Sequence, residues 1–490
     1  TIWILPHRSE SRWQTASVLN RFYEGKPEEA IKKTVSKLKG TFALVILFED
    51  QKDVIYSTRN VSPIVATICK EGAMLASDLT ALCRFTNRYF VVPEYHILKL
   101  SADKLTLTDF EGNEVLPKYL TVDWELNSAG KNGYPFYMEK EIMEQPEAIE
   151  NTIRNRIVGG MPDFTADGVP DTLFTECEHI CIVACGTAMH AGLVAQALVK
   201  SILHMHIEVQ MASEFMYSDP VIDEKTLVIA VSQSGETIDT LEAVKYAKNR
   251  GAKCLAIINV KGSSIARESD YVLYTNAGPE IAVATTKAYS TQLIASYLLA
   301  TEFARVRGVI DEDRTAELLA ELQTIPEKIE KLLEDKERIQ WFAAKQMNAQ
   351  DMFFIGRGLD YAVSMEGSLK MKEISYIHSE AYAAGELKHG TISLIEPGTL
   401  VIGVLTQQNL YEKTVSNMVE CKSRGAYLMS LTTYGNYSIE DSADFVIYIP
   451  KTEPLFAASL AVIPLQLLGY YVSVAKGLDV DKPRNLAKIT

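Results

Sequence analysis

Short runs of consecutive apolar residues, each followed by a segment with helical spacing, dominate the chain from about residue 179 onward. The clearest run covers residues 226–231. The helical segment after it ends at Gly251, and its apolar face consists of Ile238, Leu241, Val244 and Ala247. Strands this apolar are typical of a sheet buried on both faces, and their alternation with amphipathic helices predicts an α/β fold with a parallel sheet.

This pattern occurs twice. Residues 226–231, Thr-Leu-Val-Ile-Ala-Val, correspond to residues 399–404, Thr-Leu-Val-Ile-Gly-Val. The apolar segment at 179–187 corresponds in the same way to 352–358. A repeat of this length predicts two tandem copies of one domain. The copies differ after the strand, where only the first continues into a loop rich in hydroxyl groups.

The first part of the chain has a different pattern. Helical spacing covers residues 17–40, where Pro27 begins a second helix and Gly40 ends it. Strand signals then follow at 41–48, 54–58, 64–69, 73–77, 89–92 and 96–109. This part therefore reads as a separate α+β domain.

The expected organisation is a partial α+β domain, a linker, two α/β domains joined by a polar helical connector, and a tail too polar for a core. The partial domain covers residues 1–122 and the linker 123–156. The two α/β domains cover 157–310 and 346–475, with the connector at 311–345 between them, and the tail covers 476–490.

The net charge of −14 argues against a nucleic-acid or anionic-membrane partner, because no cluster of Lys and Arg outweighs the acidic residues. The longest uncharged stretch, residues 454–475, contains Pro464 and Gln466 and lies inside the second copy. We therefore expect a buried or interface helix there and not a membrane span.

Seven cysteines, none in a C-x-x-C pair, suggest a reducing cytoplasm. Cys177, Cys181 and Cys185 recur at every fourth residue, but the last two lie on an apolar strand, where packing explains them better than metal binding. No metal and no cofactor are expected.

The loop Ser232-Gln233-Ser234-Gly235-Glu236-Thr237 lies between a buried strand and the start of a helix. Ligands of open parallel sheets collect at the carboxyl ends of strands. The helix start supplies free N–H groups, and three hydroxyls and an amide add donors, so the loop can hold a phosphate without a lysine. An ordinary capped turn would have a similar composition.

A second group of polar residues contains candidates for proton transfer. Residues 363–378 are expected to form a helix, with Glu366, Lys370 and Glu373 on one face, and His389 follows in a turn-rich stretch. A carboxylate, an ammonium and an imidazole near a sugar phosphate suit carbon–proton transfer and ring opening. From spacing alone, a solvated, salt-bridged helix face with a loop histidine is the simpler interpretation. Lys488 also has two interpretations: it is a solvated lysine of the tail, or it forms a Schiff base with a carbonyl group.

Five motifs in one order give the chain a close resemblance to the glucosamine-6-phosphate synthase family, the isomerising glutamine:fructose-6-phosphate amidotransferases. The likeness covers about residue 16 to the end. The motifs are the 232–237 loop, Ala282-Val283-Ala284-Thr285-Thr286-Lys287, Lys372-Glu373-Ile374-Ser375-Tyr376-Ile377-His378, Glu386-Leu387-Lys388-His389-Gly390 and Pro483-Arg484-Asn485-Leu486-Ala487-Lys488.

The resemblance implies two sugar-isomerase domains after a partial N-terminal-nucleophile glutaminase domain. It implies conversion of fructose 6-phosphate, with nitrogen from glutamine or ammonia, to glucosamine 6-phosphate, the first step of hexosamine and UDP-N-acetylglucosamine synthesis. It also implies a homodimer in which a histidine is shared between subunits.

The resemblance further implies roles for single residues. Lys488 would form the Schiff base with C2 of the open sugar, Glu373 would move the proton between C1 and C2 with Lys370 beside it, and His389 would open the ring. The residues expected to bind the substrate are Ser232, Gln233, Ser234 and Thr237 at the phosphate, and Thr187, Ala188, the Val283 backbone and Ala487 at the sugar.

The match is weaker at the start of the chain. The family's glutaminase begins with a cysteine, whereas this sequence begins Thr1-Ile2-Trp3, and the family's glutamine-holding motifs are not found before residue 16. We therefore expect either that the front of the domain is missing from this chain or that free ammonia is used. Ala188 stands where many relatives have serine, which removes one hydrogen bond to the sugar.

Two alternatives remain open at the level of the sequence. One is a glucosamine-6-phosphate deaminase or deglycase, which runs the chemistry in the other direction. The other is a regulatory sensor of sugar phosphates, which would need the serine loop but not Lys488, Glu373 or His389.

Overall fold

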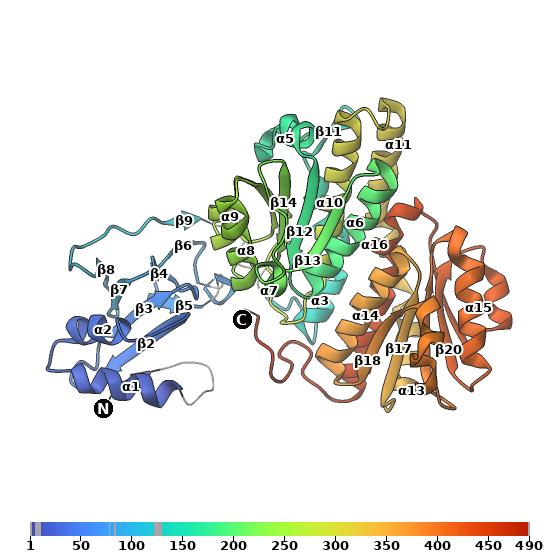
Figure 1. Cartoon of the computed structure of the whole chain (residues 1–490). Coiled ribbons are helices and arrows are strands. Elements are labelled where there is room, and N and C mark those ends of the chain that lie inside the picture. The colour runs from blue at the N-terminus through green and yellow to red at the C-terminus, as the bar shows by residue number, and fades with distance from the viewer. Residues whose placement is uncertain (1, 5–10, 78, 83–84, 122–129, 489–490) are drawn as a thin grey trace. The chain divides into compact units, whose positions relative to one another are not determined.

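The computed structural model describes the chain except for residues 1, 5–10, 78, 83–84, 122–129 and 489–490 (Figure 1). Thr1 and part of the expected linker therefore lie outside the described residues. The chain divides into two compact units, which consist essentially of Thr1–Gly130 and Lys131–Lys488. Each unit is described by itself.

The described residues of the first unit form two antiparallel sheets, two α-helices and a short 3₁₀ helix, Leu79–Ala81. Its hydrophobic clusters lie between the helices and one sheet, and between the two sheets. One sheet has the order β1-β2-β3-β7-β8 and the other β5-β4-β6-β9. The elements are α1 (Ser11–Phe22), α2 (Pro27–Val35), β1 (Ile2–Ile4), β2 (Phe42–Phe48), β3 (Ile55–Asn60), β4 (Val65–Cys69), β5 (Gly72–Ala76), β6 (Arg88–Val91), β7 (His96–Leu100), β8 (Leu105–Asp109) and β9 (Leu120–Thr121).

The expected elements of this unit are present, with two corrections. The second helix ends at Val35 and not at Gly40. The single strand predicted at 96–109 is two strands, β7 and β8, which pair as an antiparallel hairpin. Ser101 donates its backbone N–H to the Lys104 carbonyl and closes the turn between them. The same apolar alternation continues on both sides of this polar turn, so the pattern of apolar residues hid the reversal.

The first α/β domain of the second unit is a five-stranded parallel sheet in the order β13-β12-β14-β15-β16. Alternate residues of β12, β14, β15 and β16 enter two different clusters, so helices cover both faces of the sheet. All seven side chains of the central strand β14 are buried. The elements are β12 (His179–Ala184), β13 (Ile207–Met211), β14 (Thr226–Ser232), β15 (Lys253–Ile258), β16 (Tyr271–Tyr274), α5 (Asp171–Glu176), α6 (Thr187–Leu203), α7 (Ala212–Phe215), α8 (Ile238–Asn249), α9 (Ser264–Glu268) and α10 (Lys287–Val306).

The second domain repeats this topology strand for strand, in the order β18-β17-β19-β20-β21. Gly186 before α6 and Gly358 before α14 have nearly the same backbone, with φ of 55° and 57°. The duplicated α/β fold predicted from the repeat is confirmed. The elements are β17 (Asp351–Gly356), β18 (His378–Ala383), β19 (Leu400–Leu405), β20 (Tyr427–Thr433), β21 (Phe445–Ile449), α14 (Leu359–Ser375), α15 (Tyr411–Lys422) and α16 (Ala457–Ala475).

Further helices precede the first domain and connect the two. They are α3 (Tyr137–Met143), α4 (Gln145–Ile153), α11 (Glu312–Leu322), α12 (Ile325–Glu334) and α13 (Lys336–Gln346). One predicted helix boundary is wrong: α14 covers Leu359–Ser375 and not 363–378. It ends because Tyr376 has the left-handed conformation, with φ of 60°, and β18 begins at His378.

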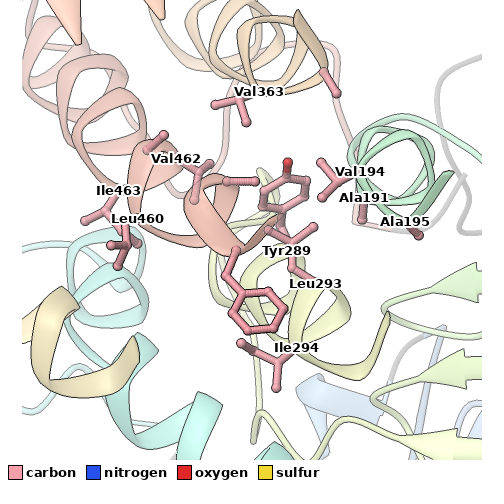
Figure 2. Close-up of a cluster of buried hydrophobic side chains, with 14 of the residues drawn as sticks. Ala191, Val194, Ala195, Tyr289, Leu293, Ile294, Val363, Leu460, Val462 and Ile463 are labelled. Atoms are coloured by element: carbon pink, nitrogen blue, oxygen red, sulfur yellow. The ribbon is translucent and has the colours of Figure 1, made fainter. Parts of the chain in front are cut away.

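Apolar helices of the two domains pack against one another to form one continuous core. Figure 2 shows side chains of α6, α10, α14 and α16 converging around Tyr289. The apolar segment Pro454–Ala475 is long enough to cross a membrane, but 94% of its 18-residue apolar window is buried in the protein. This agrees with the expectation of a buried helix.

The expectation that the tail is too polar for a core is wrong in part. Val480 and Asp481 are buried. The Asp481 carboxylate accepts hydrogen bonds from the backbone N–H groups of Tyr137 (2.9 Å) and Met138 (2.9 Å) at the start of α3. The tail is therefore held by polar contacts that its composition does not reveal.

Candidate functional site

The hydroxyl-rich loop follows β14 directly and leads into α8. The Ser232 hydroxyl accepts a hydrogen bond from the Gly235 N–H (3.0 Å) and lies 3.3 Å from the Thr237 hydroxyl. The Ser234 hydroxyl accepts one from the Glu236 N–H (3.2 Å). The loop is thus folded into a compact turn at the carboxyl edge of the sheet, where hydroxyls and the start of a helix gather.

Two neighbouring residues fix the shape of this loop. Gly235 has φ of 67°, and a Cβ there would lie 2.0 Å from the Ser263 hydroxyl, so only glycine fits. The buried Asn259 donates its N–H to the Gln233 carbonyl and uses its side chain to hold Ala277 and Gly278. Asn259 therefore connects the loop with the segment that leads to Val283.

A buried network joins the two α/β domains beside Thr187. The Glu366 carboxylate of α14 accepts hydrogen bonds from the Thr187 hydroxyl (3.1 Å) and lies 2.8 Å from Nδ1 of His190, both on α6. All three residues are buried. One end of the expected sugar site is thus tied to the helix that carries the proposed proton-transfer groups.

Lys370 links Glu366 to Glu373 on the same helix. Its Nζ lies 3.5 Å from Glu366 and 2.5 Å from Glu373. Burial alone would lower the pKa of Lys370, but the charges of Glu373 and Glu366 outweigh it, so the pKa lies above its ordinary value. The helix face predicted from spacing is real, and it is buried at Lys370 and Glu366, not solvated.

The tail brings Lys488 to a second buried carboxylate. The Lys488 Nζ donates hydrogen bonds to Glu280 Oε2 (3.0 Å) and to the Ala282 carbonyl (2.6 Å). Glu280 Oε1 accepts from the backbone N–H groups of Thr286 (3.0 Å) and Ala288 (3.1 Å) at the start of α10. Burial raises the pKa of Glu280, but Lys488 and these amides outweigh it, so the pKa lies below its usual range.

The Lys488–Glu280 pair and the Glu366–Lys370–Glu373 face interact electrostatically. The charge of Glu280 contributes to the raised pKa of Lys370, as do Glu373 and Glu366 at closer range. The structure therefore brings the tail lysine near the expected proton-transfer helix, although Lys370 and Lys488 are far apart in sequence.

The remaining predicted residues are placed as follows. The Val283 N–H donates to the Asp481 carbonyl (3.0 Å), which leaves the Val283 carbonyl for any contact with a sugar. Ala188 on α6 and Ala487 in the tail are partly buried. His389 ends a 3₁₀ turn, Ala384–His389, and is exposed. Among the described contacts, no hydrogen bond or ion pair joins His389 to Glu373 or Lys488.

In the described part of the chain, no three His, Cys, Asp or Glu residues are grouped so as to hold a metal ion. The charged groups of the site are paired with one another instead.

Comparison with known proteins places this geometry in a family. The SIS domain model matches residues 173–302 and 347–476, which are the two α/β domains. The chain is 47% identical to the glutamine–fructose-6-phosphate aminotransferase [isomerizing] of Caldanaerobacter subterraneus, over 96% of this chain and 78% of that protein. The chain belongs to the glutamine–fructose-6-phosphate aminotransferase family.

Other members of the aminotransferase family match over a similar extent. The protein of that name from Clostridium tetani is 46% identical over 99% of this chain and 78% of its own length. The C-terminal domain of glucosamine-fructose-6-phosphate aminotransferase from Francisella tularensis superimposes with a TM-score of 0.69 at 37% identity, over 72% of this chain and all of that one. Glucosamine-6-phosphate deaminase from Thermotoga maritima gives 0.56 at 24% identity, which shows the shared fold alone.

Sequence reasoning missed several residues of this aminotransferase-family site: Glu141, His190, Asn259, Glu280 and Asp481. Glu280 lies only two residues before the Ala282–Lys287 motif, in Gly278-Pro279-Glu280, and a carboxylate in an otherwise apolar loop was the available signal. The others act through partners far away in the sequence, which no spacing rule reveals.

Proposed function

We propose that this chain converts fructose 6-phosphate, with nitrogen from glutamine or ammonia, to glucosamine 6-phosphate. The observation that carries the proposal is the position of Lys488. This tail lysine is drawn to a fully buried carboxylate near the Glu366–Lys370–Glu373 helix face, with its side chain only 14% exposed. A lysine that forms a Schiff base must be held in one place, and the contacts with Glu280 and the Ala282 carbonyl hold Lys488 in this way. A sensor of sugar phosphates would have no use for it.

The phosphate is held by the first domain in this proposal. Ser232, Gln233, Ser234 and Thr237 donate to it at the start of α8, where each hydrogen bond to a charged group is worth about 1.5–3 kcal/mol. Binding energy from this remote group positions the carbonyl at the reacting end of the sugar. The names of the relatives, which mention fructose 6-phosphate, support this assignment of substrate.

The reacting groups come from the second domain and the tail. The Lys488 nitrogen attacks C2 of the open sugar and water leaves, and ammonia then displaces the lysine. Glu373 takes the proton from C1 and returns it to C2, with Lys370 holding the carboxylate in place. His389 opens the ring in a second copy of the chain, an assignment supported by its exposure and its lack of a described contact with Glu373 or Lys488.

A homodimer follows from this shared histidine and belongs to the same proposal. We also assign the reaction to the cytoplasm. All six cysteines in the described residues are unpaired, which supports a reducing compartment.

Borohydride trapping tests the proposal. Reduction in the presence of fructose 6-phosphate should leave the sugar covalently attached to Lys488, because borohydride reduces an imine to a stable amine. Mass spectrometry of the tail peptide measures the added mass, and Lys488→Arg serves as the matched control because it keeps the charge but cannot form an imine. An unmodified tail peptide at saturating sugar phosphate would reject the Schiff-base mechanism.

A further inference from the structure

The Lys488 nitrogen is the donor in both of its described contacts. It donates to both Glu280 and the Ala282 carbonyl. The amine of a lysine in water has a pKa of about 10.4 and is an ammonium at neutral pH. An ammonium nitrogen has no free electron pair and cannot attack a carbonyl. The step proposed above therefore needs a group that removes a proton from Lys488.

We propose that Glu280 is this group, a further catalytic residue that accepts a proton from Lys488 and later returns it. Of the two groups that hold Nζ, only the carboxylate is basic, and it lies 3.0 Å from the nitrogen. This inference rests on the proposed function, since it concerns the lysine that forms the Schiff base.

The proton balance closes within the site. An Nζ–H bond breaks, an Oε2–H bond forms on Glu280, and the electron pair left on Nζ makes the bond to C2. The second nitrogen proton passes to the former carbonyl oxygen, which becomes a hydroxyl. Glu280 then returns its proton to that hydroxyl, which leaves as water, and the protonated imine remains. The carboxylate is regenerated without a further acid or base.

Fixed geometry prepares Glu280 for this exchange. Its Oε1 is held by the Thr286 and Ala288 amides, so Oε2 is directed at Lys488. While Lys488 is an ammonium, its charge stabilises the buried carboxylate. When the proton leaves the nitrogen, this stabilisation disappears and burial favours the neutral acid. A dry site therefore makes the transfer easier than it would be in water.

Glu141 on α3 supports the same exchange from the other side. Its Oε1 accepts hydrogen bonds from the N–H groups of Ile281 (2.5 Å) and Ala282 (3.1 Å) and so positions the Ala282 carbonyl that holds Lys488. Its Oε2 is buried and has no partner in the described structure. Burial and the charge of Glu280 raise the pKa of Glu141 to about 7. Two adjacent carboxylates thus favour taking up one proton between them.

The pH dependence of trapping tests the inference. In the unchanged protein the proton moves within the pair, so the rate of borohydride trapping on Lys488 should be nearly constant between pH 6 and 9. In Glu280→Gln, the side-chain oxygen can still accept from Thr286 and Ala288, but none of the described hydrogen bonds of Lys488 then reaches a carboxylate, so its proton must pass to solvent. We expect trapping at pH 7 to fall about 100-fold and to rise about tenfold with each pH unit.

A role in positioning alone would give another result: Glu280→Gln would trap more slowly but with the same flat profile, which would overturn the inference. Glu280→Asp keeps a carboxylate and should keep the flat profile at a reduced rate. If Glu280→Asp gave a pH profile as steep as that of Glu280→Gln, the inference would also be overturned. Affinity for fructose 6-phosphate, measured by calorimetry, should be unchanged in both variants because the 232–237 loop is untouched.

The inference and the proposed function fail in distinguishable ways. If the unchanged protein is not trapped on Lys488, the proposed function is wrong. If it is trapped, and Glu280→Gln is trapped at the same rate and with the same profile, only the role of Glu280 is wrong.

Discussion

At the residue scale, one carboxylate distinguishes the second α/β domain from the first. Asp360 stands two residues after Gly358, as Ala188 stands two residues after Gly186. The buried Asp360 carboxylate accepts from the N–H groups of Thr406 (2.9 Å) and Gln407 (3.2 Å), which follow β19. In the second domain, hydrogen bonds therefore join the start of α14 to the segment after β19. The segment after β19 corresponds to the candidate phosphate loop after β14 of the first domain.

Asp360 predicts a pH-dependent stability. Burial raises its pKa to about 7, although the hydrogen bonds from Thr406 and Gln407 oppose this, whereas an unfolded chain has an Asp pKa of about 3.9. The folded state therefore binds the proton more tightly. The stabilisation of the folded state by protonated Asp360 is fully present below about pH 4 and is lost as pH rises through about 7.

The matching variant is Asp360→Asn, which cannot ionise. The stability of the unchanged protein relative to this variant should fall by about 2–4 kcal/mol between pH 4 and pH 8. Urea unfolding at several pH values measures this difference, and other titrating groups, Glu141 included, cancel in the comparison. Parallel pH profiles for the two proteins would show that Asp360 does not titrate in this range.

The sequence predicts site residues that lie close together along the chain, but not contacts between distant residues. The 232–237 loop and the Glu366–Lys370–Glu373 face were found because their members are close in the sequence and follow one element. The contacts of His190 with Glu366 and of Lys488 with Glu280 join segments 176 and 208 residues apart. Such contacts arise only when the two domains and the tail have packed, so no local pattern contains them.

At the element scale, the sequence predicted which helices and strands exist better than where they end. Apolar runs and helical spacing reflect burial, which extends over a whole element. Ends depend on individual backbone conformations, such as the left-handed Tyr376 that ends α14 and the turn that separates β7 from β8. The tail was misjudged for a related reason: its Asp481 carboxylate is buried against the backbone at the start of α3.

The tail is the element whose docking is most open to test. Asp481→Ala removes the carboxylate that binds the Tyr137 and Met138 amides, and hydrogen bonds to a charged group are worth about 1.5–3 kcal/mol each. We expect faster proteolysis of the tail and a drop of about tenfold or more in trapping on Lys488. Lys482→Ala, at an exposed neighbouring position, is the control and should alter neither. Equal protease resistance in the two variants would contradict this role of Asp481.

At the scale of the whole molecule, duplication gave the chain two copies of one sheet and a single continuous core. The helices that border the copies, α6, α10, α14 and α16, pack as one apolar cluster (Figure 2). The tail adds a further connection, because Arg484 stacks on Tyr376 of the second copy while Lys488 reaches Glu280 of the first. The two copies can therefore divide the work of binding and chemistry.

This division predicts the number of ligands. The first copy ends β14 in hydroxyls and Gly235, whereas the second ends β19 in a segment already bonded to Asp360. Calorimetry with fructose 6-phosphate should therefore give one molecule bound per chain. Ser234→Ala should weaken binding about tenfold, or about 1.4 kcal/mol, since it removes a hydroxyl that we propose donates to the phosphate. Gln408→Ala, exposed in the corresponding loop of the second copy, is the matched control and should bind as the unchanged protein does. Two ligands per chain, or equal weakening by both substitutions, would mean that the second copy kept the binding function of the first.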